Sequence, residues 1–241
     1  MFKEKKVIIF DMDGTLIDSV GIWNKVDMEL IKELGSKEKL NEYDIQKQRD
    51  NKLVEFSGSE NPYIGYCEFL GLKYGSKLIG EEILNIRNNI SLNYQINEID
   101  YKKGAPELIK YLKDNNYILV IATTTRKKDM DIYYSENKNI IKKANIKEYF
   151  SKVYTRENVK EIKPNPEIFL RILDEFKVKK KECLIFEDSL IGINAANNAG
   201  IDVVAIYDKY SDKERDIINE KATYNRNGFD EVIKDLIKEN I

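Results

Sequence analysis

Short apolar runs rich in β-branched residues recur along this chain, and they constrain its fold more than any other feature. The runs are Val7–Phe10, Ile118–Ala122, Leu184–Phe186 and Val203–Ile206. Continuous apolar runs of this length are typical of strands buried on both faces of a sheet. Helical patterns separate them, as in residues 106–113 and 166–176. This alternation predicts an α/β fold with a doubly wound parallel sheet, to which Lys152–Tyr154 would add a strand near an edge.

The stretch between the first two expected strands is too long for a simple crossover connection. It extends from about residue 20 to about residue 102, whereas a crossover needs little more than one helix and two short loops. Apolar residues recur in it at helical spacing, among them Trp23, Val26, Leu30, Ile79, Ile83 and Ile90. Such spacing predicts an all-helical insert. We therefore expect a core domain of residues 1–19 and 103–241 and a helical domain of residues 20–102.

The composition excludes several classes of function. The chain has no histidine, which rules out serine-histidine triads, histidine general bases and histidine-bound zinc. Its two cysteines, Cys67 and Cys183, form no CxxC pair, which argues against a disulfide framework. The 40 basic and 42 acidic residues are interspersed, so we expect no nucleic-acid partner. The first apolar run is too short for a signal sequence or a membrane span, and we expect a cytoplasmic protein without a membrane partner.

Two carboxylates follow the first expected strand in Asp11-Met12-Asp13-Gly14-Thr15, where the glycine allows the chain to turn. Polar residues also follow two later strands, at 123–125 and 187–189, and ligands bind at this rim of open α/β sheets. Neighbouring carboxylates repel without a countercharge, and oxygen-only ligands favour magnesium. The motif could instead be a loop cap. A calcium loop is excluded because an apolar strand precedes the motif and the expected glutamate position is not filled.

Together these elements resemble the haloacid dehalogenase superfamily, in the phosphatase and beta-phosphoglucomutase-like branch with a helical cap after the first core strand. The four signatures are matched by Asp11-Met12-Asp13-Gly14-Thr15, by Thr123, by Lys163 in Lys163-Pro164-Asn165-Pro166, and by Glu187-Asp188-Ser189. The resemblance extends from Val7 to about Ile206 and covers the insert only loosely. It implies a Rossmann-like core with a cap domain, and a magnesium-dependent phosphatase that acts on a small-molecule phosphate monoester.

The resemblance also implies catalytic roles for two aspartates and a lysine. Asp11 would attack phosphorus and form an aspartyl-phosphate, and Asp13 would protonate the leaving oxygen and then activate water. Lys163 would screen the negative charges of nucleophile and phosphate. Mg²⁺ would be bound by Asp11, Glu187, Asp188 and the backbone carbonyl of Asp13.

The phosphate-binding residues implied by the resemblance are the Thr123 hydroxyl, the backbone N–H of Thr124, and Lys163. Because three threonines are consecutive, Thr124 and Thr125 remain alternatives to Thr123, and all three could be simple helix caps. A second anionic or hydroxyl group of the substrate could contact Arg49, Lys52 or the turn Ser57-Gly58-Ser59.

Two other functions are alternatives to a phosphatase, and residues of this chain argue against each. A sugar-phosphate mutase of the beta-phosphoglucomutase type would be expected to carry a histidine on the linker near Trp23, and it tends to have an aliphatic residue where this chain has Thr15. A non-catalytic phospholigand sensor would keep the fold, but the complete signatures argue against it. The sequence does not identify the phosphorylated substrate, and it leaves the oligomeric state open between a monomer and a weak homodimer.

Overall fold

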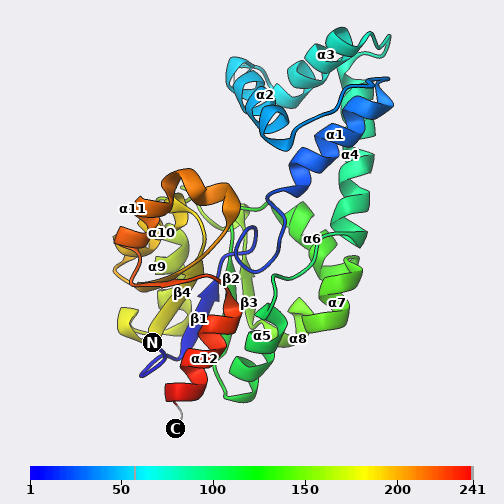
Figure 1. Cartoon of the computed structure of the whole chain (residues 1–241). Coiled ribbons are helices and arrows are strands. Elements are labelled where there is room, and N and C mark those ends of the chain that lie inside the picture. Colours follow the sequence, from blue (N-terminus) through cyan, green and yellow to red (C-terminus); the bar gives the residue numbers. More distant parts are fainter. Residues whose placement is uncertain (57, 240–241) are drawn as a thin grey trace. The chain divides into compact units, whose positions relative to one another are not determined.

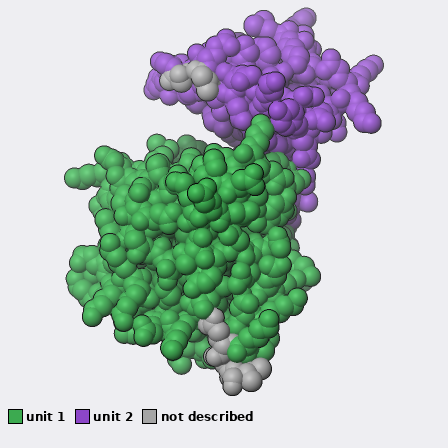
Figure 2. All heavy atoms as spheres, turned by 60° about the vertical axis from the view of Figure 1, so that its left-hand side comes forward, with its two compact units in different colours: residues 1–20, 99–241 green, residues 21–98 purple. Residues whose placement is uncertain are grey.

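The computed structural model describes residues 1–56 and 58–239 (Figure 1). The chain forms two compact units, unit 1 with Met1–Val20 and Ile99–Ile241, and unit 2 with Gly21–Glu98 (Figure 2). Ser57, which belongs to the turn named above as a possible substrate contact, lies outside the described residues. Within the described part of the chain, no helix combines the length and apolar character needed to cross a membrane.

Unit 1 is built on a six-stranded parallel sheet in the order β3-β2-β1-β4-β5-β6. The strands are β1 (Val7–Phe10), β2 (Ile118–Ala122), β3 (Lys152–Tyr154), β4 (Cys183–Glu187), β5 (Asp202–Ile206) and β6 (Tyr224–Arg226). This confirms the predicted α/β class and the doubly wound parallel sheet, with β3 at one edge. Strand β6 was not predicted, because that edge strand is short, polar and only half-buried.

Helices cover both faces of the sheet in unit 1 (Figure 1). The α-helices are α5 (Ala105–Asp114), α6 (Lys127–Ser135), α7 (Lys138–Ala144), α8 (Ile146–Tyr149), α9 (Glu167–Phe176), α10 (Leu190–Ala199), α11 (Arg215–Lys221) and α12 (Phe229–Glu239). Three 3₁₀ helices accompany them in the described residues, η1 (Arg156–Asn158), η2 (Lys180–Glu182) and η3 (Lys209–Glu214). Strand β1 is fully buried as a result, which explains why its sequence is apolar at every position.

The side chains of β1 point alternately to two separate cores. Val7 and Ile9 belong to a cluster with residues of α9, α10 and α11. Phe10 faces the other side, where its ring stacks on Phe186 at a centroid distance of 4.9 Å and meets the edge of Phe150 at 6.1 Å. The period-2 geometry of a strand therefore joins both layers of helices to one central strand.

Unit 2, in its described part, consists of four helices, α1 (Ile22–Glu33), α2 (Glu42–Glu55), α3 (Pro62–Tyr74) and α4 (Gly80–Asn97). A buried ion cluster connects three of them. Asp27 of α1 accepts hydrogen bonds from Arg49 of α2 at 2.9 Å and from Arg87 of α4 at 2.7 Å. Arg49, considered above as a substrate contact, is thus bonded to a carboxylate inside this unit.

Residues 99–102, which were expected to belong to the helical insert, pack with unit 1. Ile17 pairs with Tyr101 in an antiparallel bridge, and the N–H of Lys102 donates to the carbonyl of Leu16 at 2.8 Å. The second connection between the units therefore follows Glu98 directly.

Candidate active site

The register of the central strands brings distant acidic residues together. Phe10 is paired with Phe186 of β4, and the N–H of Asp11 donates to the Phe186 carbonyl at 2.9 Å. Asp11 and Glu187 are therefore neighbours at the carboxyl ends of β1 and β4, although most of the chain separates them in sequence. The rim of the sheet predicted to hold the site is where these carboxylates gather.

Asp11, Glu187 and Asp188 form a buried acidic cluster, each offering one carboxylate oxygen within 4.8 Å of the others. Burial raises the pKa of Asp11 well above its usual value, and although Lys163 lowers it, Glu187 and Asp188 raise it further. Burial and then the charge of Glu187 raise the pKa of Asp188 to about 7. Three buried carboxylates that offer oxygen ligands this close together could hold a divalent cation.

Lys163 is buried beside the acidic cluster and uses all three of its ammonium protons there. Its Nζ donates to Oδ1 of Asp11 at 2.7 Å, to Oε1 of Glu187 at 2.6 Å and to the carbonyl of Ala122 at 2.8 Å. Burial alone would lower the pKa of Lys163, but the charges of Asp11 and Glu187 raise it well above its usual value. Lys163 is therefore a fixed cation that orients Asp11.

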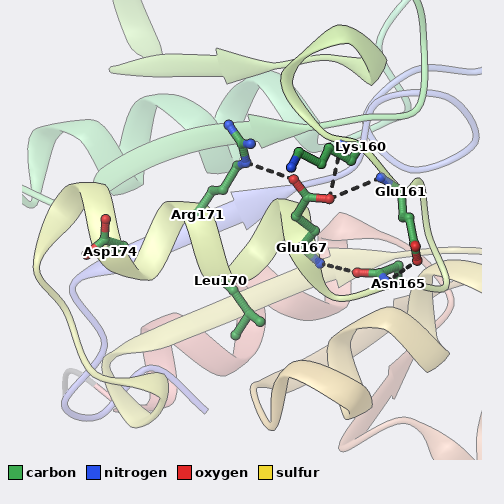
Figure 3. A pocket seen from close by; sticks show the side chains of 7 residues that line it. All are labelled: Lys160, Glu161, Asn165, Glu167, Leu170, Arg171 and Asp174. Carbon is green, nitrogen blue, oxygen red and sulfur yellow. Dashed lines mark hydrogen bonds and ion pairs between the residues drawn. The ribbon is translucent and has the colours of Figure 1, made fainter.

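The loop that carries Lys163 is tied to the start of α9, as Figure 3 shows. One carboxylate oxygen of Glu167 accepts the N–H groups of Lys160 and Glu161, both at 3.0 Å. The N–H of Glu167 donates to Asn165 at 2.9 Å. These residues line a surface pocket with Leu170, Arg171 and Asp174. None of the acidic cluster lines this pocket, and the hydrogen bonds of Glu167 hold the Lys163 loop.

Glu187 is held by its own loop as well as by Lys163. Its Oε2 accepts from the N–H of Asp188 at 3.1 Å and from the hydroxyl of Ser189 at 3.1 Å. Gly192 in the first turn of α10 leaves the space that this carboxylate occupies, since a Cβ there would come within 1.9 Å of Oε1. Glu187 therefore orients Lys163 and is packed under α10.

Asp188 is oriented by the turn after β1. The hydroxyl of Thr15 donates to Oδ1 of Asp188 at 2.7 Å. Gly14 has φ = +81°, and a Cβ at this position would lie 2.5 Å from Oδ2 of Asp188. Glycine is thus required twice over, by its backbone conformation and by the approach of the carboxylate.

Asp13 has surroundings different from those of the acidic cluster. Its Oδ1 accepts a hydrogen bond of 2.5 Å from Ser19, and its Oδ2 accepts one from Thr125. Burial raises the pKa of Asp13, and the hydrogen bonds from Ser19 and Thr125 lower it. The carboxylate of Asp13 is not part of the acidic cluster.

The three threonines that follow β2 occupy different environments. Thr123 is buried, and its hydroxyl accepts the N–H of Thr125 at 3.1 Å. Thr124 is exposed. Thr125 is half-buried and contacts Asp13. The hydroxyls of Thr123 and Thr125 therefore lie side by side at the end of β2, and that of Thr125 contacts the carboxylate of Asp13.

The catalytic, phosphate-binding and metal-binding residues expected from the sequence lie at the carboxyl ends of β1, β2 and β4 or on the loop before α9. Four features of the site were not predicted: the contact of Ser19 with Asp13, the space that Gly192 leaves for Glu187, and the contacts of Thr15 and Thr125 with carboxylates. Ser19 and Thr125 carry hydroxyl groups close in sequence to the signatures, which was the only available signal. Their bonding partners depend on loop geometry.

A parallel α/β sheet carries buried carboxylates, hydroxyls and a lysine at its rim. This arrangement is that of a hydrolase whose chemistry uses carboxylate, hydroxyl and ammonium groups. Residues 8–206 match the family described as haloacid dehalogenase-like hydrolase. The chain therefore belongs to the haloacid dehalogenase-like hydrolases, which confirms the resemblance identified from its signatures.

Individual relatives agree with this assignment. Protein YhcW of Bacillus subtilis (strain 168) is 28% identical over 207 residues, 85% of this chain and 84% of the relative. The phosphorylated carbohydrates phosphatase of Thermotoga maritima is 25% identical over 208 residues, 82% of each chain. A crystal structure from Thermotoga maritima, named "putative beta-phosphoglucomutase", matches with a TM-score of 0.73 at 20% identity, covering 98% of this chain and 100% of the other. That structure shows the shared fold.

Proposed function

We propose that this chain is a magnesium-dependent phosphatase that hydrolyses a small-molecule phosphate monoester through an aspartyl-phosphate on Asp11. The observation that carries the proposal is that two carboxylates at one rim, Asp11 buried and Asp13 half-buried, have different hydrogen-bond partners. Asp11 is bonded to Lys163 within the acidic cluster, whereas Asp13 is bonded to the hydroxyls of Ser19 and Thr125. One carboxylate is set up to attack and the other to transfer protons.

Asp11 is the nucleophile in this proposal. Lys163 holds its Oδ1, which leaves Oδ2 to form the bond to phosphorus while the bond from phosphorus to the ester oxygen breaks. The positive charge of Lys163 also lowers the pKa of Asp11 and so favours its ionised form against the effect of burial. A carboxylate nucleophile must be ionised to attack, so Lys163 supports the reaction through charge and orientation.

Asp13 supplies the proton that the leaving alcohol needs and afterwards accepts a proton from the attacking water. The raised pKa of Asp13, caused mainly by burial, favours a protonated carboxyl group at the start of the reaction. Its two oxygens are held by hydroxyls and not by Lys163, so it keeps a proton-transfer role distinct from that of Asp11.

Asp11, Asp188 and the backbone carbonyl of Asp13 would bind Mg²⁺, with Glu187 completing the acidic cluster. The bound ion would neutralise part of the charge of Asp11 and of the phosphate. Thr15 orients Asp188 for this purpose through its hydrogen bond of 2.7 Å. Thr123 and the backbone N–H of Thr124 would bind phosphate oxygens, and any contact from Lys163 would have to replace one of its three present bonds.

Substrate selection is proposed to reside in unit 2, acting as the cap domain. The phosphorylated carbohydrates phosphatase of Thermotoga maritima matches 82% of this chain, which supports phosphorylated carbohydrates as the first compounds to test. A mutase is less well supported, because the chain lacks the histidine expected for that reaction.

A panel of alkyl, sugar and aryl phosphates tests the proposal, with inorganic phosphate release as the measurement. We expect turnover that requires Mg²⁺ and is abolished in Asp11→Asn. Acid quenching during turnover should give a peptide around Asp11 with the mass of one added phosphoryl group, and borohydride should convert that residue to homoserine. Turnover that persists in Asp11→Asn, or a wild type inactive on every ester, would contradict the proposal.

A further inference from the structure

The third of the three consecutive threonines contacts the proposed acid, but the proposed mechanism gives this threonine no step of its own. The hydroxyl of Thr125 donates to Oδ2 of Asp13, opposite the hydroxyl of Ser19 on Oδ1. The two hydroxyls hold the carboxyl group of Asp13 from both ends. Each carboxyl oxygen still has a second lone pair, so a transferable proton remains compatible with both contacts.

Hydrogen bonds made by the N–H and the carbonyl of Thr125 fix the position from which its hydroxyl extends. The N–H of Thr125 donates to Oγ1 of Thr123 at 3.1 Å, and its carbonyl accepts the N–H of Arg156 at 3.2 Å. Thr123 is itself fixed, because its N–H donates to the carbonyl of Tyr154 at 3.0 Å. The hydroxyl is therefore placed by the ends of β2 and β3, so its contact with Asp13 is built into the fold.

A chain of hydroxyls connects the proposed phosphate site with the proposed acid. The hydroxyl of Thr123 lies 3.0 Å from that of Thr125, which in turn contacts Asp13. Thr123 has a single hydroxyl proton, so its hydrogen bond to the Thr125 hydroxyl is lost when that proton is donated to a phosphate oxygen. The hydrogen bond from the N–H of Thr125 to Oγ1 of Thr123 is unaffected by this exchange and keeps Thr125 in place.

We propose that Thr125 is a positioning residue for proton transfer, whose hydroxyl keeps the carboxyl group of Asp13 directed at the leaving-group oxygen. This inference rests on the proposed function. In that step, the bond from phosphorus to the ester oxygen breaks, the bond from phosphorus to Asp11 forms, and the proton of Asp13 goes to the ester oxygen. An alkoxide leaving group needs that proton, whereas p-nitrophenolate is stable without it, so the two kinds of ester should respond differently to the loss of Thr125.

The experiment compares Thr125→Val, which removes the hydroxyl at nearly constant shape, with Thr125→Ser, which keeps it. Substrates are p-nitrophenyl phosphate and the alkyl phosphate that the wild type hydrolyses best. The quantity compared is kcat/KM, because it reports the steps up to the departure of the leaving group. Asp13→Asn calibrates the full loss of the acid. Thr223→Val is the matched control, since Thr223 is remote in sequence from the signatures and its hydroxyl accepts one hydrogen bond, from the N–H of Val203.

We expect Thr125→Val to lower kcat/KM for the alkyl ester about tenfold to a hundredfold, and for p-nitrophenyl phosphate less than about twofold. Thr125→Ser should restore most of the loss, and Thr223→Val should leave both values unchanged. Thermal unfolding of each variant separates this effect from a loss of stability. If Thr125→Val does not fold, Thr125→Ala removes the same hydroxyl with a smaller side chain.

The outcomes distinguish this inference from the proposed function. If the two esters lose activity equally in Thr125→Val while Asp13→Asn is selective for the alkyl ester, the positioning role is wrong and the proposed function stands. Full activity of Thr125→Val on both esters would likewise overturn the positioning role alone. If the wild type hydrolyses neither ester, the proposed function fails, and the inference fails with it.

Discussion

The carboxylate of Glu187 occupies the space beside Gly192 so closely that a Cβ at residue 192 would lie 1.9 Å from Oε1 of Glu187. The contact joins the last residue of β4 to the first turn of α10. Glu187 has 1% of its surface exposed and bonds to Lys163, so the position of this carboxylate affects the cation that orients Asp11.

Gly192→Ala should therefore impair both stability and turnover. The added methyl group forces Glu187 or the start of α10 to move, and overpacking of this kind costs about 1–3 kcal/mol. Misplacement of Lys163 and Asp11 should lower kcat up to about a hundredfold. Chemical unfolding and phosphate release measure the two effects. Gly228→Ala is the matched control, because nothing lies within 4 Å of a Cβ at that position. Equal activity of Gly192→Ala and Gly228→Ala would show that the position of Glu187 does not affect catalysis.

Lys163→Met should destabilise the protein as well as inactivate it. Removing the ammonium group leaves Asp11 and Glu187 buried without their cation, and breaking a buried ion pair from one side costs about 3–5 kcal/mol. The measurement is the free energy of unfolding in urea without added Mg²⁺. Lys127→Met breaks an exposed pair with Asp131 and should leave stability unchanged, which provides the comparison. Wild-type stability in Lys163→Met would contradict the assignment of Lys163 as the balancing cation.

Thr15→Val should weaken Mg²⁺ binding without removing activity. The hydroxyl of Thr15 holds Oδ1 of Asp188, and loss of a partner that orients a metal ligand typically costs about tenfold to a hundredfold in metal affinity. The Mg²⁺ concentration for half-maximal activity should rise about tenfold, with kcat at saturating Mg²⁺ much less affected. Thr15→Ser keeps the hydroxyl and should restore the affinity. An unchanged Mg²⁺ requirement in Thr15→Val would contradict the proposal that Asp188, oriented by Thr15, binds the metal.

Both cysteines should be unreactive in the folded protein. Cys67 and Cys183 are buried, and burial raises the pKa of each thiol to about 12. The raised pKa lowers the thiolate fraction at pH 8 about a thousandfold relative to an ordinary thiol, since thiolate increases only as the pH approaches the pKa. A disulfide reagent added at pH 8 should titrate both thiols only after unfolding in urea. Rapid reaction of one thiol in the native protein would show that its segment opens locally.

Much of the core fold could be predicted from the sequence because its central strands are buried on both faces. Strands β1, β2, β4 and β5 each retain a continuous apolar run, so their boundaries were predicted to within about one residue. Strand β6 carries no such run, because it is a short edge strand with half-buried residues. Local sequence could not distinguish it from a loop.

The chemical types at the site were also readable from the sequence, since carboxylates, threonine and lysine follow strands at recognisable spacing. The hydrogen-bond partners of these residues within the site could not be predicted from the sequence. The resemblance gave Thr123 as the phosphate ligand and left Thr124 and Thr125 as alternatives, whereas the contact of Thr125 with Asp13 depends on how the loop after β2 closes.

By itself the sequence determined the class of fold, the family and the residues available for chemistry, because burial patterns and signature spacings are local properties of the chain. Only the tertiary structure decided which oxygen faces which proton. Lys163 bonds to both Asp11 and Glu187, and Gly192 makes room for Glu187, because strand register and helix packing bring residues distant in sequence within a few ångströms of one another. Such contacts depend on the simultaneous positions of several elements, which no local pattern encodes.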